Sequence, residues 1–154
     1  MNLLTIITLT KNNDDELLST LKSIIKYKCI CMNSELLIID GSDEIIHEKN
    51  KELICQFENN INLKIIHDES DGIYAAMNQG IKIARSKFLI FLNSGDQFSK
   101  ELDEYKVINI ISKNLNSESI NLFFCRTIII STLNEKIKYF NPAQNINLTK
   151  RIIL

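Results

Sequence analysis

The sequence contains very little proline and glycine, one and four residues respectively out of 154. It therefore has no Pro/Gly-rich linker of the kind that separates domains, and it also lacks internal repeats and low-complexity tracts. With 154 residues, of which 45% are hydrophobic, the chain is long enough to bury a hydrophobic core but too short to form two domains of ordinary size. We therefore predict a single domain over residues 1–154.

An excess of charge of either sign is also missing. The 18 basic and 19 acidic residues give a net charge of −1 and are scattered among one another. Because binding to nucleic acid depends on a basic patch or stripe, we expect no nucleic-acid partner.

Paired cysteine spacing is absent as well. The four cysteines form no CxxC pair and lie near no histidine cluster, which argues against a zinc site or a redox motif. They are Cys29, Cys31, Cys55 and Cys125. We expect free thiols or small buried hydrophobic side chains.

The sequence lacks a signal peptide and a long apolar run. Its N-terminus has no basic region and no small-residue cleavage site, and no stretch approaches the roughly 20 apolar residues of a membrane-spanning helix. We therefore expect a cytoplasmic protein. The chain ends on three apolar residues, 152–154, which we interpret as C-terminal truncation. An uncovered sheet edge or apolar helix would then favour self-association.

Short β-branched runs alternate with segments of helical period in the first half of the chain, as expected for βαβ units around a mostly parallel sheet. Four runs read as buried strands, at residues 3–10, 35–40, 63–67 and 88–92. Between them, apolar residues recur at helical spacing in three segments, and Asn13 with Glu16 forms a capping pattern before the first. The third helix carries Ala76, Gly80 and Ala84 on its packing face, which permits close approach to a strand.

The second half has a different character. Val107, Ile108, Ile111 and Leu115 predict a fourth helix. Residues 122–130 and 136–140 predict two strands that pair as a hairpin around a turn near Asn134.

Acidic and small residues follow three of the predicted strands. Asp40 opens the turn Asp40-Gly41-Ser42-Asp43, Asp68 and Asp71 follow the third strand, and Asp96 closes Asn93-Ser94-Gly95-Asp96. In any single loop, turn formation explains such residues best. Parallel neighbouring strands, however, bring the loops to one edge of the sheet. Clustered carboxylates there suit a divalent cation bridged to phosphate oxygens.

Four segments in this order resemble successive motifs of the family-2 glycosyltransferases. They are residues 4–8 with Lys11 and Asn12, residues 37–43, residues 71–81 and residues 91–96. The resemblance covers residues 3–98, and it is nearest to bacterial enzymes that extend surface polysaccharides such as colanic acid and O-antigen.

The resemblance implies an α/β GT-A (Rossmann-like) fold with a mostly parallel central sheet flanked by helices, here incomplete at the C-terminus. It also implies a UDP- or GDP-linked sugar donor, a saccharide or lipid-linked acceptor, and inversion at the anomeric carbon. Residues 1–98 would then form the nucleotide-sugar-binding half, and residues 99–154 part of the acceptor side. Lipid-linked acceptors would place the protein at the inner face of the membrane.

The same resemblance suggests roles for individual residues. Thr8 and Asp40 match positions that contact the nucleoside, and Asp71 and Asn78 match positions that line the nucleotide pocket, although Asn78 is equally well explained as a cap or packing residue. Asp96 matches the metal-binding acid of the Asp-x-Asp motif, where Mg²⁺ or Mn²⁺ bridges the diphosphate.

Two positions depart from the pattern of the family. Asn93 replaces the first acid of the metal motif, with Gly95 beside it in the same loop, and Ala75 stands where relatives have an acid. Magnesium often takes only one or two protein carboxylates, so Asp96 alone still fits a metal site.

The catalytic base is not identified by the sequence. The candidate acids are poorly placed, either at a predicted helix start or beside turns; they are Glu101, Asp103, Glu104, Glu118 and Glu135. We interpret His47 as solvated and His67 as a structural residue. Two alternatives stay open: an inactive nucleotide-binding remnant of such an enzyme, and a doubly wound domain with another function.

Overall fold

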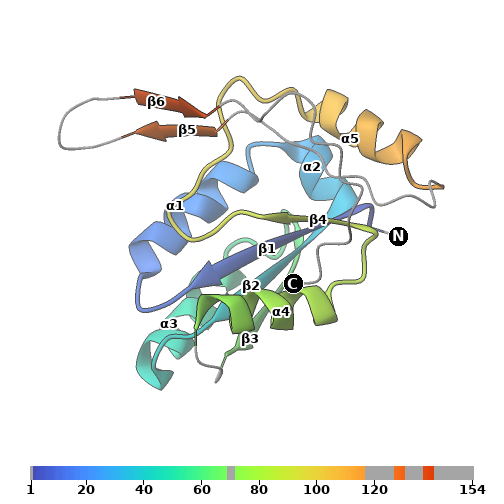
Figure 1. Cartoon of the computed structure of the whole chain (residues 1–154). Coiled ribbons are helices and arrows are strands. Elements are labelled where there is room, and N and C mark those ends of the chain that lie inside the picture. The colour runs from blue at the N-terminus through green and yellow to red at the C-terminus, as the bar shows by residue number, and fades with distance from the viewer. Residues whose placement is uncertain (1, 69–71, 117–126, 131–136, 141–154) are drawn as a thin grey trace. The chain divides into compact units, whose positions relative to one another are not determined.

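The computed structural model describes residues 2–68, 72–116, 127–130 and 137–140 (Figure 1). The chain divides into two compact units, Met1–Asn116 and Ser117–Leu154. The predicted division at residue 98 falls inside the first unit, and the predicted roles of the two parts remain predictions.

The first unit contains a parallel four-stranded sheet, and this confirms the predicted strands. The strands are β1 (Leu4–Thr10), β2 (Ser34–Asp40), β3 (Asn62–His67) and β4 (Phe88–Phe91), in the order β3-β2-β1-β4. In the register, Ile6 lies opposite Leu36 on one side and Ile90 on the other. Every residue of β1 and β2 is buried because helices cover both faces of the sheet. The predicted burial is wrong for β3 and β4, which contain no buried residue because they are the two edge strands of this sheet.

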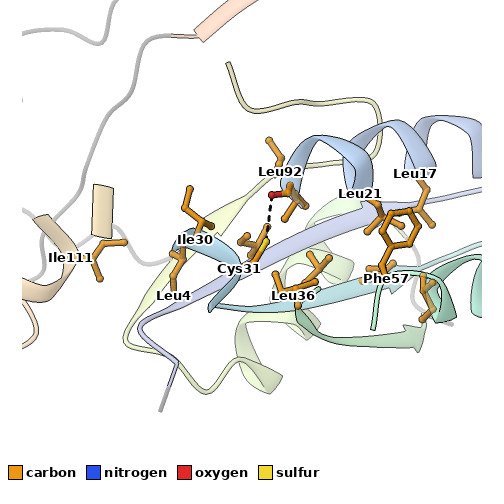
Figure 2. Packing of buried hydrophobic residues seen from close by; sticks show 14 residues of the cluster. Leu4, Leu17, Leu21, Ile30, Cys31, Leu36, Phe57, Leu92 and Ile111 are labelled. Atoms are coloured by element: carbon orange, nitrogen blue, oxygen red, sulfur yellow. Dashed lines mark hydrogen bonds between the residues drawn. The ribbon is translucent and has the colours of Figure 1, made fainter. Parts of the chain in front are cut away.

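Helices cover the two faces unequally, as Figure 1 shows. On one face lie α1 (Asp14–Ile24), α2 (Lys28–Asn33), α3 (Glu44–Cys55) and α5 (Glu104–Lys113), whose apolar residues form one core cluster with β1 and β2. On the other lies α4 (Ile73–Ile83), which packs Ala76 against Ile7 and Ile39. Figure 2 shows the larger cluster, with Leu17 and Leu21 of α1 and Phe57 after α3.

Local sequence signals start three of the helices. The Asn13 side chain accepts a hydrogen bond from the Glu16 amide at 3.2 Å, which confirms the predicted cap of α1. Asp43 caps α3 and Asp103 caps α5 in the same way.

Helix α4 lies close to the sheet, as predicted from the small residues on its packing face. A Cβ atom at Gly80 would lie only 2.7 Å from Ile7 Cγ2.

Helix α2 is absent from the sequence-based prediction. Its N-cap residue, Tyr27, provides no side-chain cap. Instead, a carboxylate oxygen of Glu104 accepts hydrogen bonds from the amides of Cys29 and Ile30, at 2.7 and 3.2 Å. Glu104, predicted only to lie at the start of its own helix, therefore also caps a helix that is distant in the sequence.

The cysteines in the described part of the chain are free thiols, as predicted. Cys31 is buried, and its thiol donates to the Ile24 carbonyl (Figure 2). Cys55 is exposed and Cys29 half-buried, while Cys125 lies outside the described residues.

In the second unit, β5 (Thr127–Ile130) and β6 (Ile137–Phe140) pair antiparallel. This confirms the predicted strand pair. Residues 122–126 and the predicted turn near Asn134 lie outside the described residues.

None of the helices in the described part of the chain is long and apolar enough to span a membrane.

Candidate functional site

The candidate site lies at the carboxyl ends of the parallel strands. β1 is paired with β2 on one side and β4 on the other, so chain order reverses at β1. Ligands of open α/β sheets bind in the crevice at such a point. The Leu92 amide donates to the Ile7 carbonyl and the Ser94 amide to the Leu9 carbonyl, both at 3.0 Å, and the chain beyond β4 thus continues alongside β1 toward its carboxyl end.

Residues 93–96, here called the acidic loop, make a tight turn at this point. The Asp96 amide donates to the Asn93 carbonyl at 2.9 Å, and Gly95 has a φ of 90°. Asp96 is exposed. Asn93 Oδ1 and Ser94 Oγ are buried atoms without a hydrogen-bond partner among the described residues. The loop therefore offers one carboxylate and two unpaired oxygens to a ligand.

These oxygen donors fit a hard divalent cation. The described residues include no group of three or more His, Cys, Asp or Glu side chains that could hold a metal by themselves. Mg²⁺ accepts such a site because it keeps several waters and binds one or two carboxylates together with substrate phosphates. The neutral Asn93 leaves Asp96 as the carboxylate of this loop.

Thr8 lies inside the fold rather than at its surface. Its side chain is completely buried, and its hydroxyl donates to the Leu92 carbonyl at 2.8 Å. Thr8 thereby fixes the segment that leads into the acidic loop. Thr10 occupies the last position of β1, and its Oγ1 is buried without a partner in the described part of the chain. Thr10 is not among the site residues predicted from the sequence, although its position at the end of a predicted strand is a signal for such a role.

Asp40 is a buried carboxylate with hydrogen bonds to both oxygens. Oδ1 accepts from the Ser42 amide at 2.9 Å, and Oδ2 contacts His47 Nδ1 at 2.9 Å and Asn50 Nδ2 at 2.8 Å. Burial by itself raises the pKa of Asp40, but the hydrogen bonds from Asn50, Ser42 and His47 outweigh it and hold the pKa below its usual value. Its predicted contact with a nucleoside remains a prediction.

The two histidines lie together at this edge of the sheet. Their rings stack with centroids 4.4 Å apart and planes inclined by 23°. His67 Nε2 lies 2.9 Å from the Ser42 carbonyl and must carry the proton, because a carbonyl only accepts. The prediction that His47 is solvated is wrong: its side chain is buried because α3 turns it toward the Asp40 carboxylate. The hydrogen bond of His67 agrees with a structural role.

The loops after β1 and β2 are joined by hydrogen bonds. The Asn12 amide donates to Ser42 Oγ at 2.8 Å, and Asn12 Oδ1 accepts from the Asp43 amide at 3.1 Å. Asn12 adopts a left-handed conformation, with a φ of 52°, which asparagine tolerates better than most residues. These hydrogen bonds therefore join the two loops into one rim at the carboxyl ends of β1 and β2.

The other predicted residues that the structure describes take no part in this network. Asn78 is exposed on α4, and Asp71 lies outside the described residues. Of the acids considered as a base, Asp103 and Glu104 are engaged as helix caps and Glu101 is exposed. Glu118 and Glu135 also lie outside the described residues.

Comparison with known sequences gives a consistent set of relatives. The family model described as Glycosyl transferase family 2 matches residues 5–121. Two uncharacterized glycosyltransferases, from Rickettsia conorii and Rickettsia felis, are 37% and 36% identical to this chain over 114 residues. Each match covers 73% of this chain but 17% of the relative, so the chain spans a small part of the length of these relatives.

Solved structures match the fold. Staphylococcus aureus TarS 1–349 has a TM-score of 0.62 at 20% identity, over 88% of this chain and 43% of that one. Its complex with UDP-GlcNAc gives 0.60 at 20% identity, over 79% and 37%. The mannosyltransferase PcManGT from Pyrobaculum calidifontis, in complex with GDP-Man and Mn²⁺, gives 0.58 at 13% identity, over 74% and 32%. These similarities confirm the predicted GT-A type of α/β fold.

Proposed function

This chain belongs to glycosyl transferase family 2, and on that premise we propose that it binds a nucleotide-diphosphate sugar as the donor part of a glycosyltransferase. The observation that carries the proposal is the acidic loop. It brings an exposed carboxylate and two unpaired buried oxygens to the carboxyl end of β1, the end at which open α/β sheets bind their ligands.

A divalent cation, Mg²⁺ or Mn²⁺, would be held by the Asp96 carboxylate and Asn93 Oδ1, with Gly95 allowing the turn between them. When bound, such a cation neutralises charge on the diphosphate leaving group. The complex of PcManGT with GDP-Man and Mn²⁺ supports this assignment. Asp96 would hold the cation, and its position in the loop would thereby set where the diphosphate end of the donor binds.

The nucleoside end of the donor would lie toward β2 and α4. Asp40 acts there by fixing the loop of residues 41–43, and Thr8 by fixing the segment that enters the acidic loop. Asp71 and Asn78 line the nucleotide pocket in this proposal. Complexes of TarS with UDP-GlcNAc and UDP and of PcManGT with GDP-Man support a UDP- or GDP-linked sugar.

The acceptor in this proposal is a growing bacterial surface polysaccharide or a lipid-linked saccharide. Transfer proceeds with inversion, by direct attack of an acceptor hydroxyl whose proton passes to a general base. The protein would work in the cytoplasm, at the inner face of the membrane where lipid-linked acceptors lie.

Calorimetric titration of UDP and GDP, each with and without Mn²⁺, tests the donor proposal. We expect one nucleotide to bind, with an affinity that rises at least tenfold with Mn²⁺, about 1.4 kcal/mol. Asp96→Ala should remove the rise. Glu101→Ala is the matched control, because this exposed acid lies just beyond the acidic loop.

The outcomes separate the parts of the proposal. Binding of neither nucleotide would overturn it, and an unchanged metal dependence in Asp96→Ala would remove Asp96 from the metal site. Nucleotide binding without any sugar transfer to saccharide or lipid-linked acceptors would indicate that this chain carries the donor site alone.

A further inference from the structure

Helix α1 presents a polar face to the segment that follows β4. Glu16, Ser19, Thr20 and Ser23 occupy positions i, i+3, i+4 and i+7, which lie on one side of a helix. Ser19 Oγ accepts from the Gln97 side chain at 2.7 Å, and Ser23 Oγ accepts from the Phe98 amide at 2.9 Å. This face therefore anchors residues 93–98 from a helix more than 70 positions earlier.

Thr20 makes the central contacts of this face. Its side chain is completely buried, and its Oγ1 accepts from the Gly95 amide at 2.9 Å. The single hydrogen of this hydroxyl faces two carbonyl acceptors, that of Asp96 at 2.9 Å and that of Asn93 at 3.3 Å. A hydroxyl combines one donor with two acceptor lone pairs, and Thr20 uses both functions on the acidic loop.

The loop has little freedom at the residue that Thr20 holds. Gly95 has a φ of 90°, which side chains with a Cβ rarely adopt. Its amide also lies 3.3 Å from the Glu16 carbonyl, and a Cβ there would lie 3.2 Å from Glu16 Oε2. The peptide unit before Gly95 and the one after Asp96 are thus held against α1. Because these two units flank Gly95 and Asp96, they set the direction in which the Asp96 side chain leaves the loop.

We propose that Thr20 is a positioning residue for the cation and diphosphate at Asp96. This inference rests on the proposed function. Thr20 acts through the backbone of the acidic loop and does not touch the ligand. A misplacement of about 1 Å in a binding group is enough to weaken ligand binding strongly. Loss of the Thr20 hydrogen bonds should therefore lower the affinity measurably.

Three variants separate positioning from general stability. Thr20→Val keeps the size of the side chain and removes every hydrogen bond of its hydroxyl to the acidic loop, while Thr20→Ser keeps the hydroxyl. Ser23→Ala is the matched control, because it removes a hydrogen bond from the same helix to the same segment, two residues beyond Asp96. If the valine variant fails to fold, Thr20→Ala replaces it.

The measurement is calorimetric affinity for the nucleotide with and without Mn²⁺, on the full chain. We expect Thr20→Val to lose about tenfold of the Mn²⁺-dependent affinity and none of the metal-free affinity. Thr20→Ser should restore the metal-dependent value, and Ser23→Ala should match the wild type.

Three results would overturn the inference: an unchanged metal-dependent affinity in Thr20→Val, an equal loss in Ser23→Ala, or no rescue by serine. If the wild type binds neither nucleotide, the proposed function and this inference both fail. If the wild type binds with Mn²⁺ and Thr20→Val does so equally well, only the role of Thr20 is rejected.

Discussion

The Nδ1 atom of His47 lies 2.9 Å from Oδ2 of Asp40, and both side chains are buried. Since the carboxylate accepts, the Nδ1 of His47 carries the hydrogen of this bond. Asn50 donates to the same oxygen and the Ser42 amide to the other one. The buried Asp40 carboxylate, at the end of β2, is thus hydrogen-bonded to the loop that follows this strand and to two side chains of α3. It thereby holds these three segments together beside the candidate site.

Asp40→Asn should destabilise the protein in a pH-dependent way. Hydrogen bonds hold the pKa of Asp40 below its unfolded value, so its carboxylate stabilises the fold above that unfolded pKa. The contribution is lost as the pH falls through the folded pKa. We expect the variant to lose about 2–3 kcal/mol of unfolding free energy near neutral pH. The difference should shrink below about pH 4, as measured by urea unfolding.

The control for this experiment is Glu52→Gln, which removes an exposed carboxylate from α3, the helix that supplies His47 and Asn50. Its unfolding free energy should follow the wild type across the pH range. A difference between Asp40→Asn and wild type that stays constant from pH 7 to pH 3 would contradict the role assigned to the ionised carboxylate.

Gly80→Ala should destabilise the protein although alanine favours helices. The new Cβ would lie 2.7 Å from Ile7 Cγ2, so α4 must move away from the sheet. Overpacking costs about 1–3 kcal/mol, against a gain in helix propensity of about 1 kcal/mol. We expect a net loss of about 1–2 kcal/mol in urea unfolding. Lys82→Ala, on the exposed part of α4, is the control, and a stabilised Gly80→Ala would show that the packing is looser than described.

Cys31 and Cys55 should differ in reactivity toward maleimide. Burial, with a further contribution from Glu104, raises the pKa of the Cys31 thiol to about 11, so little thiolate forms at pH 8. Cys55 is exposed. We expect native protein to be labelled at Cys55, and at Cys31 only after unfolding in urea. Mass spectrometry of digested samples distinguishes the sites, with Cys55→Ser as control; rapid labelling of native Cys31 would contradict the packing of α2.

Glu35→Gln should affect stability without affecting nucleotide binding. Glu35 Oε1 accepts from Thr5 Oγ1 at 2.6 Å and from the Arg85 amide at 2.8 Å, near the beginning of β2. Five residues of strand, about 16 Å, separate it from Asp40. We expect a loss of about 1 kcal/mol in unfolding free energy and an unchanged affinity in the UDP and GDP titrations. A loss of affinity would indicate that part of the binding site lies at the amino ends of the strands, opposite to the proposed site at their carboxyl ends.

The sequence predicted best those features that depend on neighbouring residues. The four parallel strands follow from short apolar runs, and the start of α1 follows from Asn13, whose side chain caps its own helix. Helix α2 was not predicted because its N-terminal amides are satisfied by Glu104, which lies 75 positions from Cys29 in the sequence. A six-residue helix with such a distant cap has no local signal.

By itself, the sequence determined the alternation of strands and helices, the close approach at Gly80, and the loop that carries Asp96, since each depends on local spacing and residue type. Only the tertiary structure decided that His47 is buried against Asp40 and that Thr20 holds the acidic loop. These contacts join residues from different elements, and the burial of a charge or hydroxyl depends on which partner the fold brings within hydrogen-bond distance. For that reason, composition and periodicity identify the residues available for a site, whereas packing decides which of them are used to support it.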